Sequence, residues 1–425
     1  MRRMECNSYR KLLLMVLVLG LLIGGSGCGN SSSVHSRTIH HSADAQDDSE
    51  RETEILETDK EDVLTQDAGS DEQSAEDLWV SQKLAEMTIE EKICQMFMVT
   101  PETLTGYRVV TEAGTVTKKS LEQYPVGGMI YFASNLQNAS QTCTMLQNTG
   151  EYARVNHDIP IFLAVDEEGG SVARIGRNSN FSVVEIPAMR KIGDSGDSLK
   201  AYEAGDLIGS YLADLGFNLD FAPDADVLTN PSNTVIGDRA FGTDAQRVSD
   251  MMLQLADGLL DNDVIPCVKH FPGHGCTEGD THQGLAYTEK TLEELKSCEL
   301  VPFQKAVDRK LPVIMVSHIS VPSVTGDYTP ASLSYYMVTE LLRGEMGYNG
   351  VVITDAMGMG AITKHYECGE AAVLAIEAGC DMLLVTSGFK AAYESVLAAV
   401  EDGRIPERQI DTSVERILRI KYCLH

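Results

Sequence analysis

The sequence predicts an α/β protein whose folded part is a single (β/α)8 barrel of the TIM type, preceded by a signal peptide and a disordered acidic stalk. From about residue 79, short continuous apolar runs alternate with amphipathic stretches, as in parallel strands that helices bury on both faces. Eight such units follow one another, as a barrel requires. An open doubly wound sheet is the alternative, but no Gly-x-Gly-x-x-Gly follows the first strand to support it.

The N-terminus has the layout of a secretory signal. Basic residues between positions 2 and 11 precede the apolar run Leu12–Ile23, and the small residues 24–27 lead to Cys28. This run is short for a full membrane span. We expect residues 1–27 to be a lipoprotein signal peptide and Cys28 to be lipidated, which would anchor the protein to the extracytoplasmic face of the cell membrane. A plain signal peptide or an uncleaved anchor helix is the alternative.

The segment after Cys28 is strongly acidic. Between Asp44 and Asp77 there are 15 acidic residues and only two basic ones. Such a segment buries too little apolar surface to fold, and its self-repulsion should extend it. We therefore expect residues 28–78 to be a lipidated cysteine and a disordered linker, and residues 79–425 to form the folded domain.

The overall composition excludes one class of partner and leaves others open. The net charge of −29 argues against nucleic acid, whose binding proteins carry basic patches. An anionic substrate stays possible because local basic residues can line a pocket. The ten cysteines are scattered and indicate no disulfide pattern. Cys94, Cys267 and Cys380 lie in apolar runs and are expected in the core, whereas Cys276 could be reactive.

The apolar runs and the amphipathic stretches between them give the expected elements in chain order. The eight expected strands are Ile93–Met98, Gly127–Phe132, Pro160–Val165, Asn218–Phe221, Val264–Lys269, Pro312–Ser317, Val351–Thr354 and Met382–Val385. The expected helices include Asn135–Arg154, Leu199–Leu215, Asp244–Asn262, Leu292–Asp308 and Ala371–Ala378.

Polar side chains follow several of the expected strands. They are Asp166 after the third, Asp224 and Asp226 after the fourth, the block 269–282 (KHFPGHGCTEGDTH) after the fifth, His318 after the sixth and Asp355 after the seventh. Because the carboxyl ends of barrel strands meet at one face, these groups should converge on one pocket.

The block 269–282 is the most informative of these segments. It holds three histidines, a lysine and an aspartate, and histidine has the side-chain pKa nearest neutrality. Three histidines and an aspartate could bind zinc, but the block has neither a Cys-x-x-Cys nor a helical His-x-x-x-His. We expect neither a metal nor another cofactor. The remaining alternative is a polar loop without chemistry.

Several motifs together resemble glycoside hydrolase family 3, and more narrowly its NagZ-type β-N-acetylglucosaminidases. They lie between residue 84 and the C-terminus in the family's order. They are LAEMTIEEK at 84–92, PVGG at 125–128, DEEGGSVAR at 166–174, NLDFAP at 218–223, IGDRAF at 236–241, the block 269–282, PASLS at 330–334 and TDAM at 354–357. The resemblance implies that residues 79–425 are a catalytic domain of this family's N-terminal, barrel type.

The resemblance also implies the roles of individual residues. Family 3 enzymes are retaining, with Asp355 as the expected nucleophile that forms a glycosyl-enzyme. The NagZ-like branch uses a histidine as acid/base with an aspartate two residues earlier, here His282 and Asp280. The expected substrate-binding residues are Asp166, Arg174, Arg239, Lys269 and His270. We expect His274 to hold the loop and His318 to be a pocket-wall residue.

Each role has a structural alternative. Asp355 could cap a helix, Asp280 and His282 could merely brace the loop, and Arg239 could form a local ion pair with Asp238. This sequence also departs from the NagZ-like pattern: it has Ser171 where an arginine is usual, Cys276 where a small residue or aspartate is frequent, and Ala356 and Gly358 beside the strand-seven methionine. None of these departures removes a proposed catalytic group.

The expected function is an exo-acting β-N-acetylhexosaminidase that hydrolyses terminal non-reducing N-acetylglucosamine from peptidoglycan fragments or related glycans. The neutral base leaves phosphorolysis open beside hydrolysis. The alternatives are a β-glucosidase-like glycosidase of the same family, a non-catalytic sugar-binding lipoprotein and a transporter's solute-binding lipoprotein. The expected partners are N-acetylglucosamine-containing glycans or muropeptides and, through the lipid anchor, the membrane; we expect a monomer. The stretch 413–421 looks like a closing barrel helix, so the barrel's own loops should complete the site.

Overall fold

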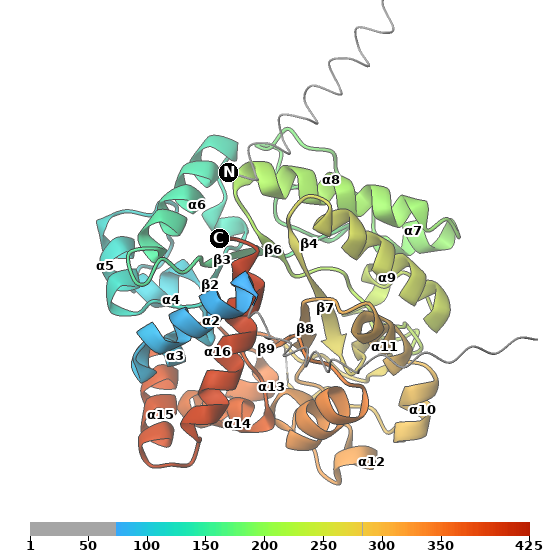
Figure 1. The fold of residues 1–425 in the computed structure, drawn as a ribbon. Helices are drawn as coiled ribbons and strands as arrows, with labels where there is room; N and C mark the ends of the chain where they lie inside the picture. The colour runs from blue at the N-terminus through green and yellow to red at the C-terminus, as the bar shows by residue number, and fades with distance from the viewer. Residues whose placement is uncertain (1–73, 283) are drawn as a thin grey trace, which may run out of the picture. The chain divides into compact units, whose positions relative to one another are not determined.

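The computed structural model describes residues 74–282 and 284–425 (Figure 1). The expected signal peptide, the lipidation site Cys28 and the stalk up to residue 73 lie outside this part of the chain. Among the helices of residues 74–425, none combines the length and the apolar character that a membrane span requires.

Parallel strands form the centre of the fold. They are β1 (Phe97–Val99), β2 (Gly128–Ile130), β3 (Phe162–Val165), β6 (Leu219–Asp220), β7 (Ile265–Phe271), β8 (Val313–Val316), β9 (Val351–Thr354) and β10 (Leu383–Val385). Their order in the sheet is β10-β1-β2-β3-β6-β7-β8-β9. A parallel bridge between Ile353 and Met382 brings the edge strands β9 and β10 together. The eight strands therefore form a nearly closed barrel, which confirms the predicted fold class.

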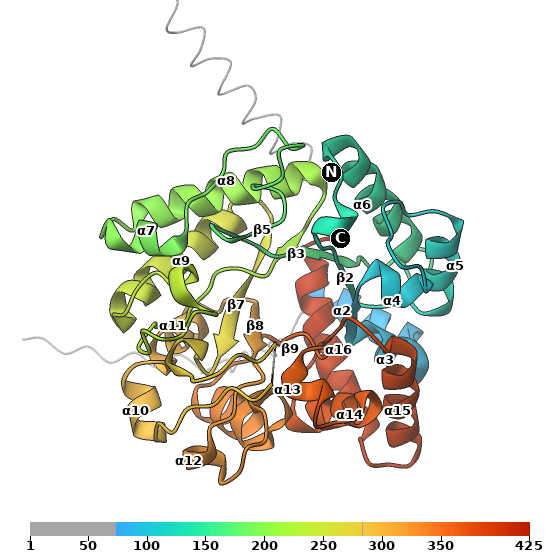
Figure 2. The same ribbon diagram turned by 180° about the vertical axis from the view of Figure 1, so that it is seen from behind.

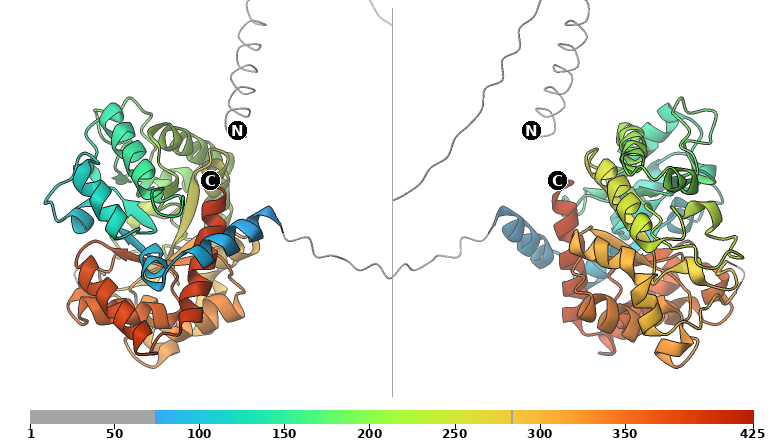
Figure 3. Two further views of the ribbon diagram at one scale, coloured as in Figure 1. Left: turned by 60° about the vertical axis from the view of Figure 1, so that its left-hand side comes forward. Right: turned by 90° about the vertical axis from the view of Figure 1, so that its right-hand side faces the viewer.

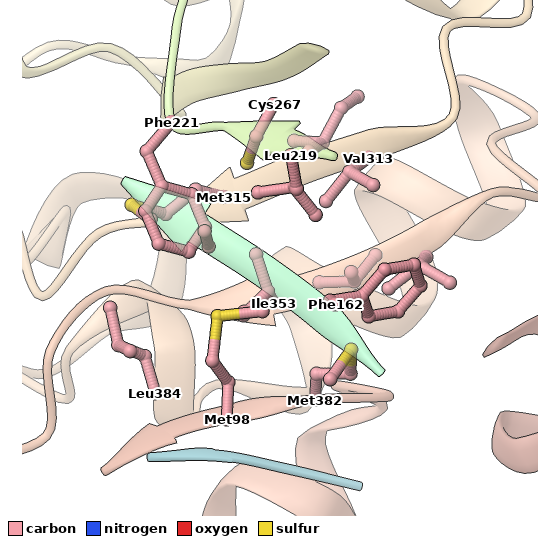
Figure 4. Close-up of a cluster of buried hydrophobic side chains, with 14 of the residues drawn as sticks. Met98, Phe162, Leu219, Phe221, Cys267, Val313, Met315, Ile353, Met382 and Leu384 are labelled. Carbon is pink, nitrogen blue, oxygen red and sulfur yellow. The ribbon is translucent and has the colours of Figure 1, made fainter. Parts of the chain in front are cut away.

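The inside of the barrel is filled by apolar side chains (Figure 4). Met98, Phe162, Leu219 and Ile353 come from four strands and are all buried. Gly128 makes room for two of them, because a Cβ at this position would lie 2.5 Å from the Met98 Cε and 3.2 Å from the Phe162 Cβ. The barrel is thus a packed core rather than a channel, and the room for a ligand lies beyond its strand ends.

Helices surround the barrel, as the views from the front and from behind show (Figures 1 and 2). In chain order they are α2 (Ala75–Glu86), α3 (Ile89–Gln95), α4 (Pro101–Thr105), α5 (Thr115–Gln123), α6 (Ala139–Ala153), α7 (Met189–Asp194), α8 (Leu199–Leu215), α9 (Ala245–Leu260), α10 (Leu292–Ser297), α11 (Leu300–Asp308), α12 (Pro322–Thr325), α13 (Gly360–Thr363), α14 (Cys368–Ala378), α15 (Phe389–Glu401) and α16 (Glu407–Tyr422). A π-helix, η5, spans Tyr336–Glu345, and a short hairpin of β4 (Glu167–Gly169) and β5 (Val172–Ala173) follows β3.

The first and last helices of the described residues pack side by side (Figure 3). Arg419 of α16 donates to Asp77 and Glu76 of α2 at 2.8 and 3.1 Å. Helix α2 begins at Ala75, where the Ser74 side chain accepts a hydrogen bond from the Asp77 N–H. Residues 75–78, which we placed in the linker, are therefore helical.

Two predicted elements differ from the structure in type or continuity, beyond shifts of their ends. The first three residues of the expected strand Ile93–Met98 are instead the end of helix α3. The Thr88–Glu91 capping box starts this helix, which runs to Gln95. The expected helix Leu292–Asp308 is two helices, α10 and α11, which break at Cys298. Pro302 explains the break, since a proline ring clashes with the carbonyl group four residues earlier in a continuous helix.

The cysteines of residues 74–425 are all free thiols. Cys94, Cys267 and Cys380 are buried, as predicted. Burial raises the pKa of the Cys276 thiol to about 12, so the expectation that Cys276 is reactive is wrong at neutral pH.

The packed barrel interior predicts a large effect of truncating Phe162. We expect Phe162→Ala to lower the free energy of unfolding by about 3–5 kcal/mol, because the substitution leaves a cavity in the interior. Denaturant-induced unfolding would measure this change. Val184, which is 61% exposed, offers the control, and Val184→Ala should change stability by less than about 0.5 kcal/mol. Equal stabilities of the two variants would contradict this account of the core.

Candidate active site

A cavity of about 900 Å³ lies at the carboxyl ends of the barrel strands. Residues that follow β3, β6, β7 and β9 line it together. The cavity brings together every catalytic and substrate-binding residue that the sequence predicted: Asp166, Arg174, Arg239, Lys269, His270, Asp280, His282 and Asp355. Their individual roles stay predictions, but their convergence is a property of the structure.

Asp355 lies directly after β9 and is partly exposed to the cavity. Its main-chain N–H donates to the Val316 carbonyl at 2.8 Å, which ties the residue to β8, and its Oδ1 accepts from the Ala356 N–H at 2.7 Å. Burial raises the pKa of Asp355, whereas His318, His270, the hydrogen bond from the Ala356 N–H and Lys269 lower it, and the net shift is downward. Asp355 is therefore an ionised carboxylate at neutral pH.

Asp280 and His282 form a hydrogen-bonded pair on the long loop after β7. The Asp280 Oδ1 accepts from the His282 main-chain N–H and lies 2.9 Å from the His282 Nδ1. The loop returns on itself as a hairpin, because Glu278 and Tyr287 exchange main-chain hydrogen bonds of 3.0 and 3.1 Å. The His282 side chain is 64% exposed, so its ring is open to solvent and to a ligand in the cavity.

The most buried part of the site is an ion cluster around Glu168. The Glu168 side chain, 1% exposed, accepts from Lys269 Nζ at 2.6 Å and from Arg239 Nε and Nη2 at 2.8 Å each. Burial raises the pKa of Glu168, but Arg239 and Lys269 lower it far more, so the carboxylate stays charged. Glu168 thereby holds the side chains of Lys269, from strand β7, and Arg239, from the loop after β6.

Asp166 and Arg174 lie on the open side of this cluster. Asp166 accepts from Lys269 Nζ at 2.9 Å and from Arg174 Nη2 at 3.3 Å. The Arg174 Nε is buried and has no hydrogen-bond partner within the described residues. An unpaired buried donor at a cavity wall is costly unless a ligand accepts from it. The Arg174 side chain is nevertheless 28% exposed and lines the cavity, so its guanidinium is placed to meet a ligand.

His270 is a neutral imidazole whose two nitrogens are both engaged. Its Nε2 lies 3.2 Å from Arg239 Nη2, which can only donate, so Nε2 is the acceptor and Nδ1 carries the hydrogen. The Nδ1 then donates to Asp226 Oδ2 at 2.7 Å. Burial lowers the pKa of His270 to about 4. His270 therefore supports Arg239 instead of offering a positive charge to a ligand.

Asp224, Asp226 and His270 form a buried group whose ligand atoms lie within 4.8 Å of one another, close enough to consider a metal ion. Two observations speak against this use. The 2.7 Å contact between His270 and Asp226 is a direct hydrogen bond, and the Arg239 Nε lies 3.8 Å from the Asp224 Oδ2. The guanidinium already supplies the positive charge at this place.

The other two histidines of the motifs brace the site. His274 lies 2.9 Å from the Thr277 hydroxyl and 3.2 Å from the Thr281 hydroxyl, so it holds the loop as predicted. The His318 Nε2 donates to the Ala356 carbonyl at 3.1 Å, and its Nδ1 lies 2.7 Å from the Ser332 hydroxyl. His318 is completely buried and stands behind the residue that follows Asp355, so the expectation of a pocket-wall role is wrong.

Sequence reasoning gave no role to Glu168, although its motif was recognised. The signal that could have found it is the alternation of Asp166 and Glu168 after a strand end, which places two carboxylates on one side. Asp226 was seen as a strand-end residue only, because its contact with His270 is set by the packing of two loops.

The fold and the cavity together define a barrel enzyme: an ionised carboxylate, a histidine–aspartate pair and paired charges meet at one set of strand ends. The model of the glycosyl hydrolase family 3 N-terminal domain matches residues 88–420 of the chain. The chain belongs to this family of glycoside hydrolases.

Known relatives and solved structures place the chain within the family. It is 31% identical to β-hexosaminidase A of Pseudoalteromonas piscicida over 324 residues, which are 71% of this chain and 54% of the relative. The structure of a family 3 β-N-acetylglucosaminidase from Paenibacillus sp. str. FPU-7 is similar with a TM-score of 0.75 and 39% identity, over 79% of this chain and 62% of that one. LpqI of Mycobacterium tuberculosis is similar with a TM-score of 0.70 and 31% identity, over 80% and 96%. The chain thus spans about half the length of the first of these relatives.

The buried neutral imidazole of His270 makes stability depend on pH. Its pKa in the folded protein is about 4 against an ordinary value of 6.5, so the unfolded chain binds a proton first as the pH falls. The contribution of His270 is complete above pH 6.5 and is lost as the pH falls towards 4. Between pH 6.5 and pH 4, we expect the free energy of unfolding of His270→Gln to fall by up to about 3 kcal/mol less than that of the wild type. Denaturant unfolding at several pH values measures it, with His365→Gln, at an exposed histidine, as the control. An unchanged pH profile in His270→Gln would contradict the assignment.

Proposed function

We propose that the protein is a retaining, exo-acting β-N-acetylhexosaminidase that hydrolyses terminal non-reducing N-acetylglucosamine from glycans. The observation that carries this proposal is the presence of ionised Asp355 and the Asp280–His282 pair at one cavity. The relatives named β-hexosaminidase and the similar β-N-acetylglucosaminidase structure support the choice of sugar.

In the first step, Asp355 attacks the anomeric carbon of the sugar and the glycosidic bond breaks. Oδ1 is engaged with the Ala356 N–H, so Oδ2 is the oxygen that would form the new bond. The hydrogen bond from Ala356 also holds the carboxylate in one orientation, which a nucleophile requires. The product of this step is a glycosyl ester of Asp355 and a free leaving group.

His282 transfers the proton in both steps. Nδ1 is held by Asp280, so Nε2 is the nitrogen that would give its proton to the departing glycosidic oxygen. Neutral Nε2 then takes a proton from the water that attacks the glycosyl ester, which restores Asp355 and the charged imidazole. Asp280 fixes the tautomer of His282, because its carboxylate accepts from Nδ1.

The charged groups on the opposite wall would bind the sugar. Asp166 offers carboxylate oxygens to hydroxyl groups, and Arg174 offers its partly exposed guanidinium. Lys269 uses two of its hydrogens on Asp166 and Glu168, which leaves the third for a ligand. Acceptors and donors of both charge signs would thus be available to a polar, uncharged ring.

Peptidoglycan fragments are the natural substrate that we propose, because the N-terminal sequence favours a protein tethered outside the cytoplasm. A β-glucosidase of the same family is the second candidate. A non-catalytic sugar-binding lipoprotein is the third, and the presence of Asp355, Asp280 and His282 together in the cavity speaks against it.

The function is tested with the full chain and aryl glycosides. We expect cleavage of the 4-nitrophenyl β-N-acetylglucosaminide in preference to the β-glucoside. Asp355→Ala should lower kcat by at least about 10³-fold, because the covalent route is lost. His282→Ala should lower kcat by about 10²–10⁴-fold for chitobiose, but less for a 2,4-dinitrophenyl glycoside, whose leaving group needs no proton. A 5-fluoro glycosyl fluoride of N-acetylglucosamine should leave its sugar on the peptide that contains Asp355, as mass spectrometry would show.

His365→Ala serves as the control, because this exposed histidine is not among the residues that line the cavity. Preferred cleavage of the glucoside would move the protein to the second candidate. Sugar binding without cleavage of either glycoside would favour the third. An equal loss for both leaving groups in His282→Ala would contradict the role of His282 as the acid.

We also propose that Cys28 carries the lipid anchor. The support is the order of basic residues, apolar run and small residues that precede it. Cells that express the full chain should incorporate labelled fatty acid into the protein, and Cys28→Ala should abolish the label and release the protein from the membrane fraction. Cys6→Ala, within the expected signal peptide, is the control and should change neither. Labelling that persists in Cys28→Ala would contradict the anchor.

A further inference from the structure

Between Asp166 and Glu168 lies a third carboxylate, Glu167, which does not face the cavity. Its side chain is completely buried in β4. Glu167 Oε2 accepts from the main-chain N–H groups of Arg174 and Ile175 at 2.6 and 2.9 Å. Glu167 Oε1 accepts from the Gly176 N–H at 2.7 Å and from the Tyr211 hydroxyl at 2.9 Å.

These four hydrogen bonds use the whole acceptor capacity of the Glu167 carboxylate. A carboxylate has about four lone-pair sites, and four donors occupy them here. Burial raises the pKa of Glu167, and these four hydrogen bonds oppose that rise. Its three main-chain partners are consecutive, which means that one side chain fixes the course of the backbone from residue 174 to residue 176.

Arg174 is the first of these residues, and its guanidinium belongs to the cavity. Its Nε is buried without a partner, and its Nη2 donates to Asp166 at a long 3.3 Å. Its side-chain contacts alone therefore hold it weakly. The strong constraint on its position is the main-chain hydrogen bond to Glu167 of 2.6 Å.

We propose that Glu167 is a positioning residue for the reaction: it holds the backbone at Arg174 so that the guanidinium of this arginine, which lines the cavity, meets the substrate. Tyr211 of α8 completes the arrangement by anchoring the Glu167 carboxylate to the outer helix layer. The expected effect of Glu167 on the kinetics rests on the proposed glycosidase function, whereas its effect on the backbone does not depend on that function.

Glu167→Gln is the sharpest variant, because it keeps the size of the side chain. The amide oxygen can replace only one carboxylate oxygen, and its NH₂ group would face the donors at the other. We expect kcat/KM for the N-acetylglucosaminide to fall about 10- to 100-fold, mainly through KM, because a displaced contact group loses binding. Glu185→Gln, at an exposed glutamate of the following loop, is the matched control and should match the wild type.

A double-mutant cycle separates positioning from a general loss of structure. If Glu167 acts through Arg174, then kcat/KM of the double variant should be close to that of Arg174→Ala alone. Effects that multiply in the double variant would overturn the proposal, as would wild-type kinetics of Glu167→Gln. The measurements belong at a temperature at which circular dichroism shows every variant folded.

Hydrogen exchange gives a readout that does not need activity. The amides of residues 174–176 should exchange at least about tenfold faster in Glu167→Gln than in the wild type, because their acceptor is weakened. Unchanged exchange in this segment would overturn the proposal even if the kinetics changed. A wild type that cleaves no N-acetylglucosaminide would refute the proposed function instead, and the exchange experiment would still decide whether Glu167 holds this backbone.

Discussion

The site depends on the ion pairs of the Glu168 carboxylate. This carboxylate is buried, and it binds Lys269 from β7 and Arg239 from the loop after β6. An isolated charge at this depth would be strongly unfavourable, whereas one carboxylate with two cations leaves a positive charge that Asp166 balances. Removal of one member of such a cluster costs about 3–5 kcal/mol, because the others stay buried without a partner. The ion cluster therefore joins three loops of the barrel face into one wall.

The two walls of the cavity differ in how firmly they are held. Lys269 and Arg239, the two cations that contact Glu168, each have a further charged partner, and Glu167 adds main-chain contacts to the same hairpin. The proposed acid/base pair lies on a loop whose fixed points include the Glu278–Tyr287 pair and the hydrogen bond from the Ala361 N–H to the Thr281 carbonyl. A wall that recognises the sugar gains from rigidity, since each pre-aligned donor loses little entropy on binding. The group that transfers a proton must reach both a leaving group and a water molecule, and its exposed ring suits that task.

Much of the fold could be predicted from the sequence because parallel strands buried on both faces appear as short apolar runs. Strand β9 and helix α8 were predicted with the boundaries that the structure has. The errors have local causes that a pattern of hydrophobicity does not contain. The capping box at Thr88 extends a helix into an apolar run, and Pro302 divides another helix. The motifs also identified residues that line one cavity, but they do not say which of these residues contact each other. Glu168 and Asp226 were missed for that reason, since their partners lie far away in the sequence.

The contacts of His270 show why a residue's place in a motif does not give its charge. The resemblance to the family implied only that His270 binds the substrate. The structure places its Nε2 against an arginine that can only donate, and this single contact determines the tautomer, the neutral state and the direction of the bond to Asp226. A protonated His270 would face the Arg239 guanidinium at 3.2 Å with two like charges in a buried place, which explains why its pKa is low. The cations that line the cavity include Arg174 and Lys269, and His270 serves to keep Arg239 turned towards Glu168.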